Sequence, residues 1–150
     1  MSLQEELLSF ANSVGDMFRR RVAETPDGLA FLDPDRAPEG PNQWTRYTWA
    51  ESRLLVDQLA AGLLARGLSR EQRVGIISTT RLEWILLDLA VACAAGATTT
   101  VYPNTAAGDV EFILDDSGTC IVVVEDATQL AKVEASPTLR AAVHTIVVID

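Results

Sequence analysis

The chain has 150 residues, of which 48% are hydrophobic, and a formal net charge of −9 at pH 7. This length fits one domain with a sizeable core, and the negative charge argues against a nucleic-acid-binding surface, which would be basic. The longest apolar stretch, residues 85–95, contains Asp88 and is shorter than the roughly 20 residues that cross a bilayer. The N-terminus lacks the order of a secretory signal. Cys93 and Cys120 lack the spacing of metal ligands, and we expect buried, reduced thiols in a cytoplasmic protein.

The first third of the chain predicts a helix followed by a hairpin. Apolar residues recur at helical spacing from Leu7 to Ala23, which indicates an amphipathic helix. Arg19–Arg21 stand in its last turns and leave two interpretations open. They form a solvated face beside the negative end of the helix dipole, or they contact phosphate or a membrane surface. Residues 29–33 and 43–47 predict two strands, joined by a loop with three prolines.

Residues 48–66 give a clear helix signal. Thr48-Trp-Ala-Glu51 has the pattern of a capping box, in which a hydroxyl and a carboxylate each satisfy a backbone amide at the helix start. Leu55, Leu59 and Leu63 form one apolar stripe. Gly67 follows the last periodic residue and predicts a left-handed helix end.

Strands and helices alternate through the second half of the chain. The predicted elements are a strand at 73–78, an apolar helix at 82–95, a strand at 97–102, an amphipathic helix at 106–117, a strand at 120–124 and a strand at 145–150. Asp126 and the Ser136-Pro137 pair predict two further helix starts. This alternation predicts an α/β fold with a mainly parallel sheet flanked by helices. Continuous apolar strands further indicate that both faces of the sheet are covered.

Two strand-to-helix turns are candidates for function. Thr80-Arg-Leu-Glu83 fits a capping box, although free amides at such a turn also bind anions. Residues Tyr102–Thr105 leave a strand at the carboxyl edge, where open α/β sheets bind ligands. Here Asn104 or Thr105 predicts a helix cap, with direct ligand contact as the alternative. The helix at 82–95 is apolar all round and must be covered on all sides.

Common catalytic and metal-binding patterns are absent from the sequence. It has no glycine-rich dinucleotide or P-loop motif, no zinc spacing and no nucleophile elbow. The lone His144 has no partner acid or nucleophile in the pattern, so we predict no catalytic or metal-ligating residue. Three interpretations remain: part of an enzyme whose catalytic residues lie elsewhere, a receiver-like regulatory domain, or a binding and assembly module.

Several segments, in order and spacing, resemble the opening of the adenylate-forming (AMP-binding) enzymes. They are Thr48-Trp-Ala-Glu51, Arg73-Val-Gly-Ile-Ile-Ser78, Thr80-Arg-Leu-Glu-Trp84, Ala95-Gly-Ala-Thr98, Val101-Tyr-Pro-Asn-Thr105 and Phe112-Ile-Leu-Asp-Asp-Ser-Gly118. Within this family, the sequence most resembles the bacterial long-chain fatty acid–CoA ligases. The more specific segments for this resemblance are Thr80–Trp84 and Val124-Glu-Asp126, which follows Cys120-Ile-Val-Val. The resemblance covers about Val14 to Asp150.

The resemblance implies a reaction and its cofactors. Such ligases activate a fatty acid with ATP and Mg to an acyl adenylate, then transfer the acyl group to coenzyme A. The phosphate-gripping loop, the adenine-binding motifs and the C-terminal catalytic lysine of the family have no counterpart in this sequence. Residues 1–150 therefore resemble an incomplete N-terminal α/β portion of the AMP-binding domain, which we expect to be inactive alone and to bind no cofactor tightly. Alternatives are an aryl acid or acyl-AMP ligase, or a noncatalytic regulatory or interaction domain.

The resemblance also suggests one site residue and several partners. Lys132 falls on a helix where these ligases place basic residues that hold the nucleotide part of coenzyme A, and Gln129 falls where a relative has arginine. The alternative for Lys132 is an ordinary solvated lysine. We expect no nucleic-acid partner, a cytoplasmic location with peripheral membrane contact left open, and self-association through uncovered apolar surface and strand edges.

Overall fold

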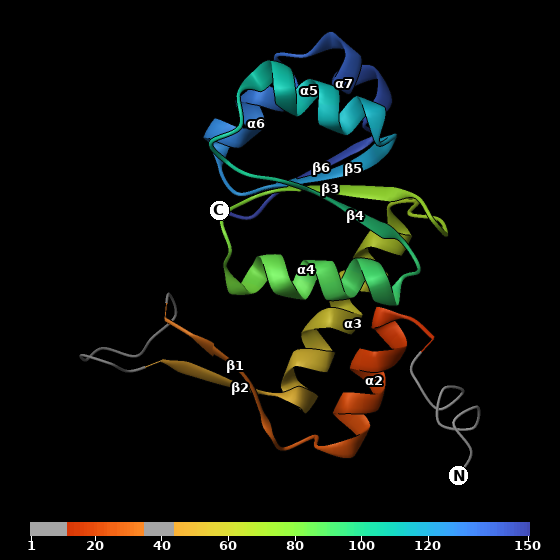
Figure 1. The fold of residues 1–150 in the computed structure, drawn as a ribbon, viewed down its shortest axis with the longest axis vertical. Helices are drawn as coiled ribbons and strands as arrows, with labels where there is room; N and C mark the ends of the chain where they lie inside the picture. Colours follow the sequence, from red (N-terminus) through yellow and green to blue (C-terminus); the bar gives the residue numbers. More distant parts are fainter. Residues whose placement is uncertain (1–11, 35–43) are drawn as a thin grey trace, which may run out of the picture.

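A computed structural model describes residues 12–34 and 44–150 (Figure 1). The elements in chain order are α2 (Val14–Glu24), β1 (Leu29–Asp33), β2 (Thr45–Thr48), α3 (Trp49–Ala65), β3 (Arg73–Ile77), α4 (Leu82–Cys93), β4 (Ala97–Val101), α5 (Ala107–Asp116), β5 (Thr119–Val124), α6 (Ala127–Glu134), α7 (Pro137–Ala142) and β6 (Thr145–Val148). None of the described helices is long and apolar enough to cross a membrane.

The predicted parallel sheet is confirmed. Four strands pair in the order β4-β3-β5-β6, and all three pairings are parallel. Helices cover both faces: α5, α6 and α7 lie on one side, and α4 lies on the other with α3 and α2 beyond it (Figure 1). The predicted hairpin is also confirmed, because β1 and β2 pair antiparallel in a separate two-stranded sheet.

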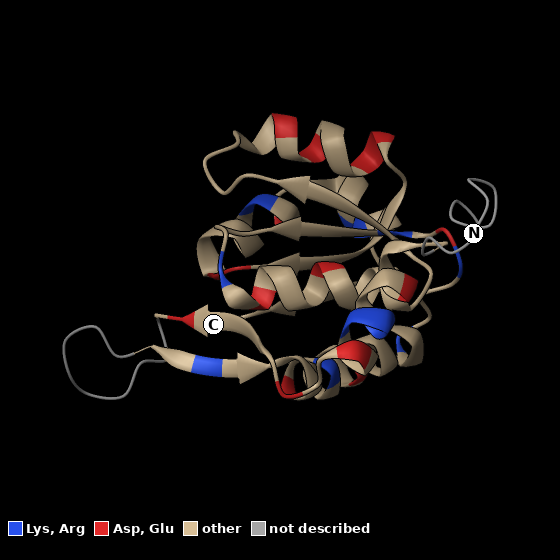
Figure 2. Ribbon diagram, turned by 60° about the horizontal axis from the view of Figure 1, so that its bottom comes forward, with Lys and Arg blue, Asp and Glu red and all other residues tan. Residues whose placement is uncertain are grey.

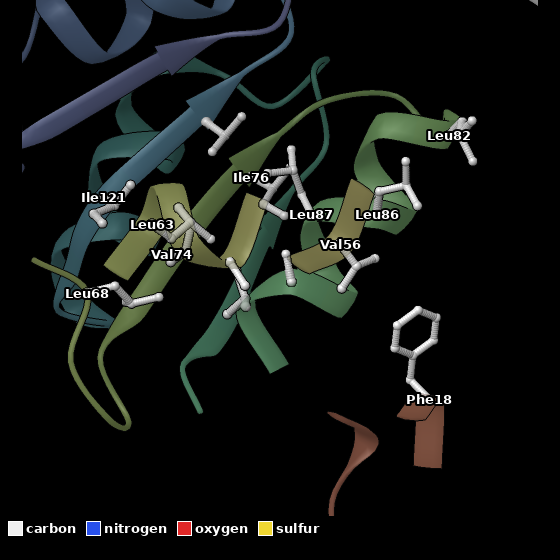
Figure 3. Packing of buried hydrophobic residues seen from close by; sticks show 14 of the residues in the cluster. Phe18, Val56, Leu63, Leu68, Val74, Ile76, Leu82, Leu86, Leu87 and Ile121 are labelled. Carbon is white, nitrogen blue, oxygen red and sulfur yellow. The ribbon is translucent and has the colours of Figure 1, made fainter. Parts of the chain in front are cut away.

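Alternate residues of the strands enter two separate cores. Val74, Ile76, Ile121 and Val123 face α4, in the cluster drawn in Figure 3. Their neighbours on the other face pack under α5, α6 and α7, and this second cluster consists of Ile77, Val101, Val110, Leu114, Val122, Val124, Val133, Leu139 and Val143. The continuous apolar runs of the strands are thus explained by burial on both faces.

Helix α4 is covered along most of its length but not all of it. Leu86, Leu87, Ala90 and Val91 are buried and belong to one hydrophobic cluster with residues of the sheet, α3 and α2; Figure 3 labels Leu86 and Leu87 in this cluster. Near its N-terminal end a groove of about 360 Å³ opens between α3, α4 and the last strands. It is lined by Tyr47, Leu55, Gln58, Leu59, Leu82, Glu83, Leu86, Leu87, Val123, Val147 and Ile149.

Helix α2 begins later than the sequence pattern predicts. Its first residue is Val14, with the Ser13 side chain accepting from the Asp16 amide, while the predicted start at residues 7–11 lies outside the described residues. Each of the three arginines has an intramolecular partner. Arg19 donates to the Cys93 carbonyl at 2.9 Å, Arg20 pairs with Asp16 at 3.0 Å, and Arg21 lies 5.4 Å from the Trp49 ring centre. All three arginines remain exposed, so the solvated face that the sequence suggested is present, with these contacts within it.

The two ends of α3 follow the prediction. The Thr48 and Glu51 side chains form the reciprocal capping box, and accepting from the Thr48 amide lowers the pKa of the Glu51 carboxyl. Gly67 has φ +92° at the helix end, where a side chain would be strained. Cys93 and Cys120 are free, as expected, but half-buried rather than fully buried. Burial raises the pKa of the Cys93 thiol, which makes it a poorer nucleophile.

Candidate functional site

The carboxyl edge of the parallel sheet has the geometry of a ligand-binding crevice. After β3 the chain passes to α4 on one face of the sheet, and after the neighbouring β5 it passes to α6 on the other face (Figure 1). Adjacent strands whose connections diverge in this way form a topological switch point, where open α/β sheets bind ligands. The residues beyond β3 and β5 are therefore the first candidates for function.

A hydrogen-bonded cluster of this chain's own side chains occupies that switch point. Glu125, after β5, accepts from both the amide and the hydroxyl of Thr79 at 2.8 and 2.7 Å. Arg81 bonds Glu83 at 2.8 Å and Asp150, beyond β6, at 3.1 and 3.3 Å. Arg81 also lies 3.7 Å from Glu125. This cluster joins the ends of β3, β5 and β6 to the start of α4. We call it the clasp, and it consists of Thr79, Arg81, Glu83, Glu125 and Asp150.

The opposite charges within the clasp stabilise its hydrogen bonds. Hydrogen bonds to Asp150 and then Glu83 raise the pKa of the Arg81 guanidinium above its ordinary value. One guanidinium faces three carboxylates, and its side chain is only 17% exposed. The cluster is net negative, so it is unsuited to an anionic ligand. Within residues 12–34 and 44–150 no group of three or more potential metal ligands is found either.

The predicted cap at Thr80–Glu83 is wrong. The N-cap of α4 is Arg81, without a side-chain hydrogen bond to a helix amide. The reason is that Glu83, the predicted capping carboxylate, bonds the Arg81 guanidinium instead. Asn104 and Thr105 do not cap α5 either, because its N-cap is Ala106 and no side chain bonds the first amides.

A small polar cavity opens beside the clasp, between the ends of β3 and β4. Its volume is about 230 Å³, and its lining combines hydroxyl and aromatic side chains with one aliphatic residue: Ser78, Thr80, Trp84, Thr100, Val101 and Tyr102. The Tyr102 side chain is 76% exposed. This cavity is therefore one open part of the carboxyl edge among the described residues, next to the filled space of the clasp.

Lys132 lies close to this edge but is not an ordinary solvated lysine. It is half-buried, and its Nζ donates to the carbonyl oxygens of Pro103 at 2.6 Å and Thr105 at 2.9 Å. Gln129, one turn earlier, is only 6% exposed. Its side-chain oxygen has no hydrogen-bond partner within the described part of the chain. Asp126 caps their helix through the Gln129 amide, as predicted.

Charge is distributed unevenly around the sheet (Figure 2). The charged residues of α5 are all acidic, whereas α2, behind α4, carries three consecutive arginines. Asp126 caps α6 and Glu125 is bound to Thr79. Neither carboxylate is therefore placed to act as the phosphate-accepting group that a receiver domain needs. The sequence analysis did not predict the clasp; the available signal was an acidic residue just beyond each of two strands, Glu125 directly after β5 and Asp150 two residues after β6.

Comparison with known proteins places this architecture in a family. FadD15 of Mycobacterium bovis, a long-chain-fatty-acid–CoA ligase, is 35% identical over 101 residues, which are 65% of this chain and 17% of that protein. The uncharacterised protein Rv1549 of Mycobacterium tuberculosis is 28% identical over 110 residues, 73% of this chain and 59% of that protein. The crystal structure of the N-terminal domain of FACL13 from Mycobacterium tuberculosis superposes with a TM-score of 0.82. It is 24% identical and covers 93% of this chain and 34% of its own.

The match to a family sequence profile covers most of the chain. The profile described as AMP-binding enzyme matches residues 18–150, which include every element from α3 to β6. The chain spans only a small share of the length of the ligases it resembles. The fold, the sequence relatives and this profile agree, and the chain belongs to the AMP-binding enzyme family.

Proposed function

We propose that this chain is the opening α/β portion of a long-chain fatty acid–CoA ligase. The whole enzyme would use ATP and Mg to convert a fatty acid to its acyl adenylate and would then pass the acyl group to coenzyme A. The observation that carries the proposal is the similarity to FadD15, together with the match of residues 18–150 to the family. A cytoplasmic enzyme that meets its substrate at a membrane surface is consistent with this role.

A chimera tests this proposal. Residues 18–150 would replace the corresponding N-terminal segment of Mycobacterium bovis FadD15, and formation of palmitoyl-CoA would be compared with formation of benzoyl-CoA. We expect activity with palmitate and none above background with benzoate. A folded chimera without activity toward either acid would contradict the assignment. Preference for benzoate would instead support an aryl acid ligase.

The chain by itself should not form acyl adenylate. A phosphoryl or adenylyl transfer needs preorganised donors around the developing charge. The one guanidinium of the clasp, Arg81, is already bound by carboxylates, and the described residues that line the 230 Å³ cavity include no basic side chain. We expect no palmitate-dependent exchange between ATP and pyrophosphate in the presence of Mg. Exchange clearly above a blank without protein would refute this prediction.

A second candidate function is a noncatalytic interaction domain. The matched segment makes up 59% of Rv1549 but only 17% of FadD15. Proteins therefore exist in which a similar segment lacks the long remainder of a ligase. If this chain is such a protein, it should fold alone and add nothing to ligase activity in the chimera.

We also propose that Lys132 contacts a phosphate of coenzyme A in the complete enzyme. Two of its three ammonium hydrogens are donated to carbonyls, which leaves one for an anion. A half-exposed contact of this kind contributes about 0.5–1.5 kcal/mol and weakens in salt. Lys132→Ala in the chimera should therefore raise the KM for coenzyme A about two- to tenfold. Adenylation, measured by pyrophosphate exchange, should not change; an unaltered KM at low salt would exclude the contact.

Self-association of the isolated chain is a further proposal. The groove beside α4 exposes apolar side chains, and the edge strands β4 and β6 each have one unpaired side in the described sheet. The charge of −9 opposes association, so added salt should strengthen it by screening. We expect light scattering at micromolar concentration to show a dimer or larger species. A monomer at both low and high salt would contradict the proposal.

A further inference from the structure

The loop between β4 and α5, residues 102–106, has little to hold it in place. Its own backbone supplies one turn bond, from the Thr105 amide to the Tyr102 carbonyl at 3.0 Å. The helix that follows has no side-chain cap at Ala106. Tyr102, at the start of the loop, is 76% exposed. These local contacts alone are therefore not enough to hold the segment in one conformation.

A contact from a distant helix supplies the missing restraint. The Lys132 ammonium on α6 donates to the carbonyl oxygens of Pro103 and Thr105, 29 and 27 residues away in sequence. Bonds from a charged donor are shorter and stronger than neutral ones, and half-burial protects them from water. Because the one ammonium group binds the carbonyls of both Pro103 and Thr105, it fixes the orientation of both peptide planes. The path of the loop between them is fixed as a result.

Fixing the loop also fixes one wall of the polar cavity. Tyr102 lines the 230 Å³ space together with Trp84 and Thr100, whereas Lys132 itself does not line it. We propose that Lys132 is a positioning residue, which holds the 102–106 loop and thereby places Tyr102 at the mouth of this cavity. This role requires neither ATP nor coenzyme A, so it can be tested independently of the proposed ligase activity.

The sequence makes this role directly measurable, because Lys132 is its only lysine. An Arg70→Lys variant adds a reference lysine at a site where the arginine side chain is 83% exposed. Reductive methylation should then modify Lys132 about tenfold or more slowly than position 70, because the bonded ammonium must first break free of the loop. Equal rates at the two positions would overturn the proposal, whether or not any Lys132 variant folds.

Lys132→Met tests the effect on the loop, since methionine keeps the apolar stem and removes the charge and the donors. We expect the Thr105 amide to exchange with deuterium about tenfold or more faster, while the Val123 amide in the core of β5 is unaffected. The Trp84 indole signal should shift, and that of Trp49, which is remote from the cavity, should not. Lys132→Arg keeps a cation with several donors and should restore part of the Thr105 protection. Unchanged exchange at Thr105 in a folded Lys132→Met variant would overturn the proposal.

Discussion

Replacing Leu86 by aspartate should prevent the chain from folding. Leu86 is 5% exposed and packs in the cluster between α4, α3 and the sheet (Figure 3). A carboxylate there would lose its hydration without gaining a cation, because among the described residues Glu83 is the only charged one that lines the adjoining groove. An unpaired buried charge costs several kcal/mol, which rivals the roughly 5–15 kcal/mol that stabilises a whole domain.

The measurement is thermal unfolding followed by circular dichroism. Leu54→Asp is the matched control, because the same substitution falls on α3 at a side chain that is 64% exposed. Its effect should stay within about 0.5 kcal/mol, as for most surface substitutions. If Leu86→Asp melted cooperatively at the temperature of the parent chain, the packing of α4 described above would be wrong.

Much of this fold could be predicted because three of the four parallel strands, β3, β5 and β6, consist mainly of consecutive apolar residues. Burial on both faces removes the alternation that marks other strands, and β5, Thr119–Val124, is buried at five of its six positions. Helix starts were predictable only where the capping side chain had no better partner. Thr48, Asp126 and Ser136 do cap their helices, whereas Glu83 accepts a hydrogen bond from the Arg81 guanidinium instead.

The clasp and the lysine contact could not be predicted because they depend on tertiary register. Arg81 and Asp150 are 69 residues apart and meet only because β6 joins the sheet beside β5. Lys132 reaches Pro103 only because α6 and α5 lie on the same face of the sheet. In both cases the sequence shows the type of residue but not its neighbours. A solvated lysine and a bonded lysine on a helix have the same local pattern.

Gly75→Val should destabilise the chain even though valine favours strands. Gly75 lies in β3 between β4 and β5, opposite Thr99 and Val122. A Cβ at this position would stand 2.6 Å from Leu114 Cδ2 and 3.1 Å from Thr119 Cγ2. Leu114 belongs to α5 and is fully buried, so its side chain cannot move out into solvent. The two further methyl groups of valine add to the clash, and overpacking of this kind costs about 1–3 kcal/mol.

Urea denaturation of Gly75→Val and three further variants isolates this cause. Gly108→Ala is the control, because nothing lies within 4 Å of the added carbon and the position is in helix α5; there alanine should stabilise by about 0.5–1 kcal/mol. Leu114→Ala alone opens a cavity and should cost about 2–5 kcal/mol. The double variant Gly75→Val/Leu114→Ala should lose less than the sum of the two single losses, since the valine methyls fill the space that Leu114 leaves. Strict additivity would mean that Gly75 and Leu114 are not in contact, and that α5 does not pack on β3 as closely as this structure has it.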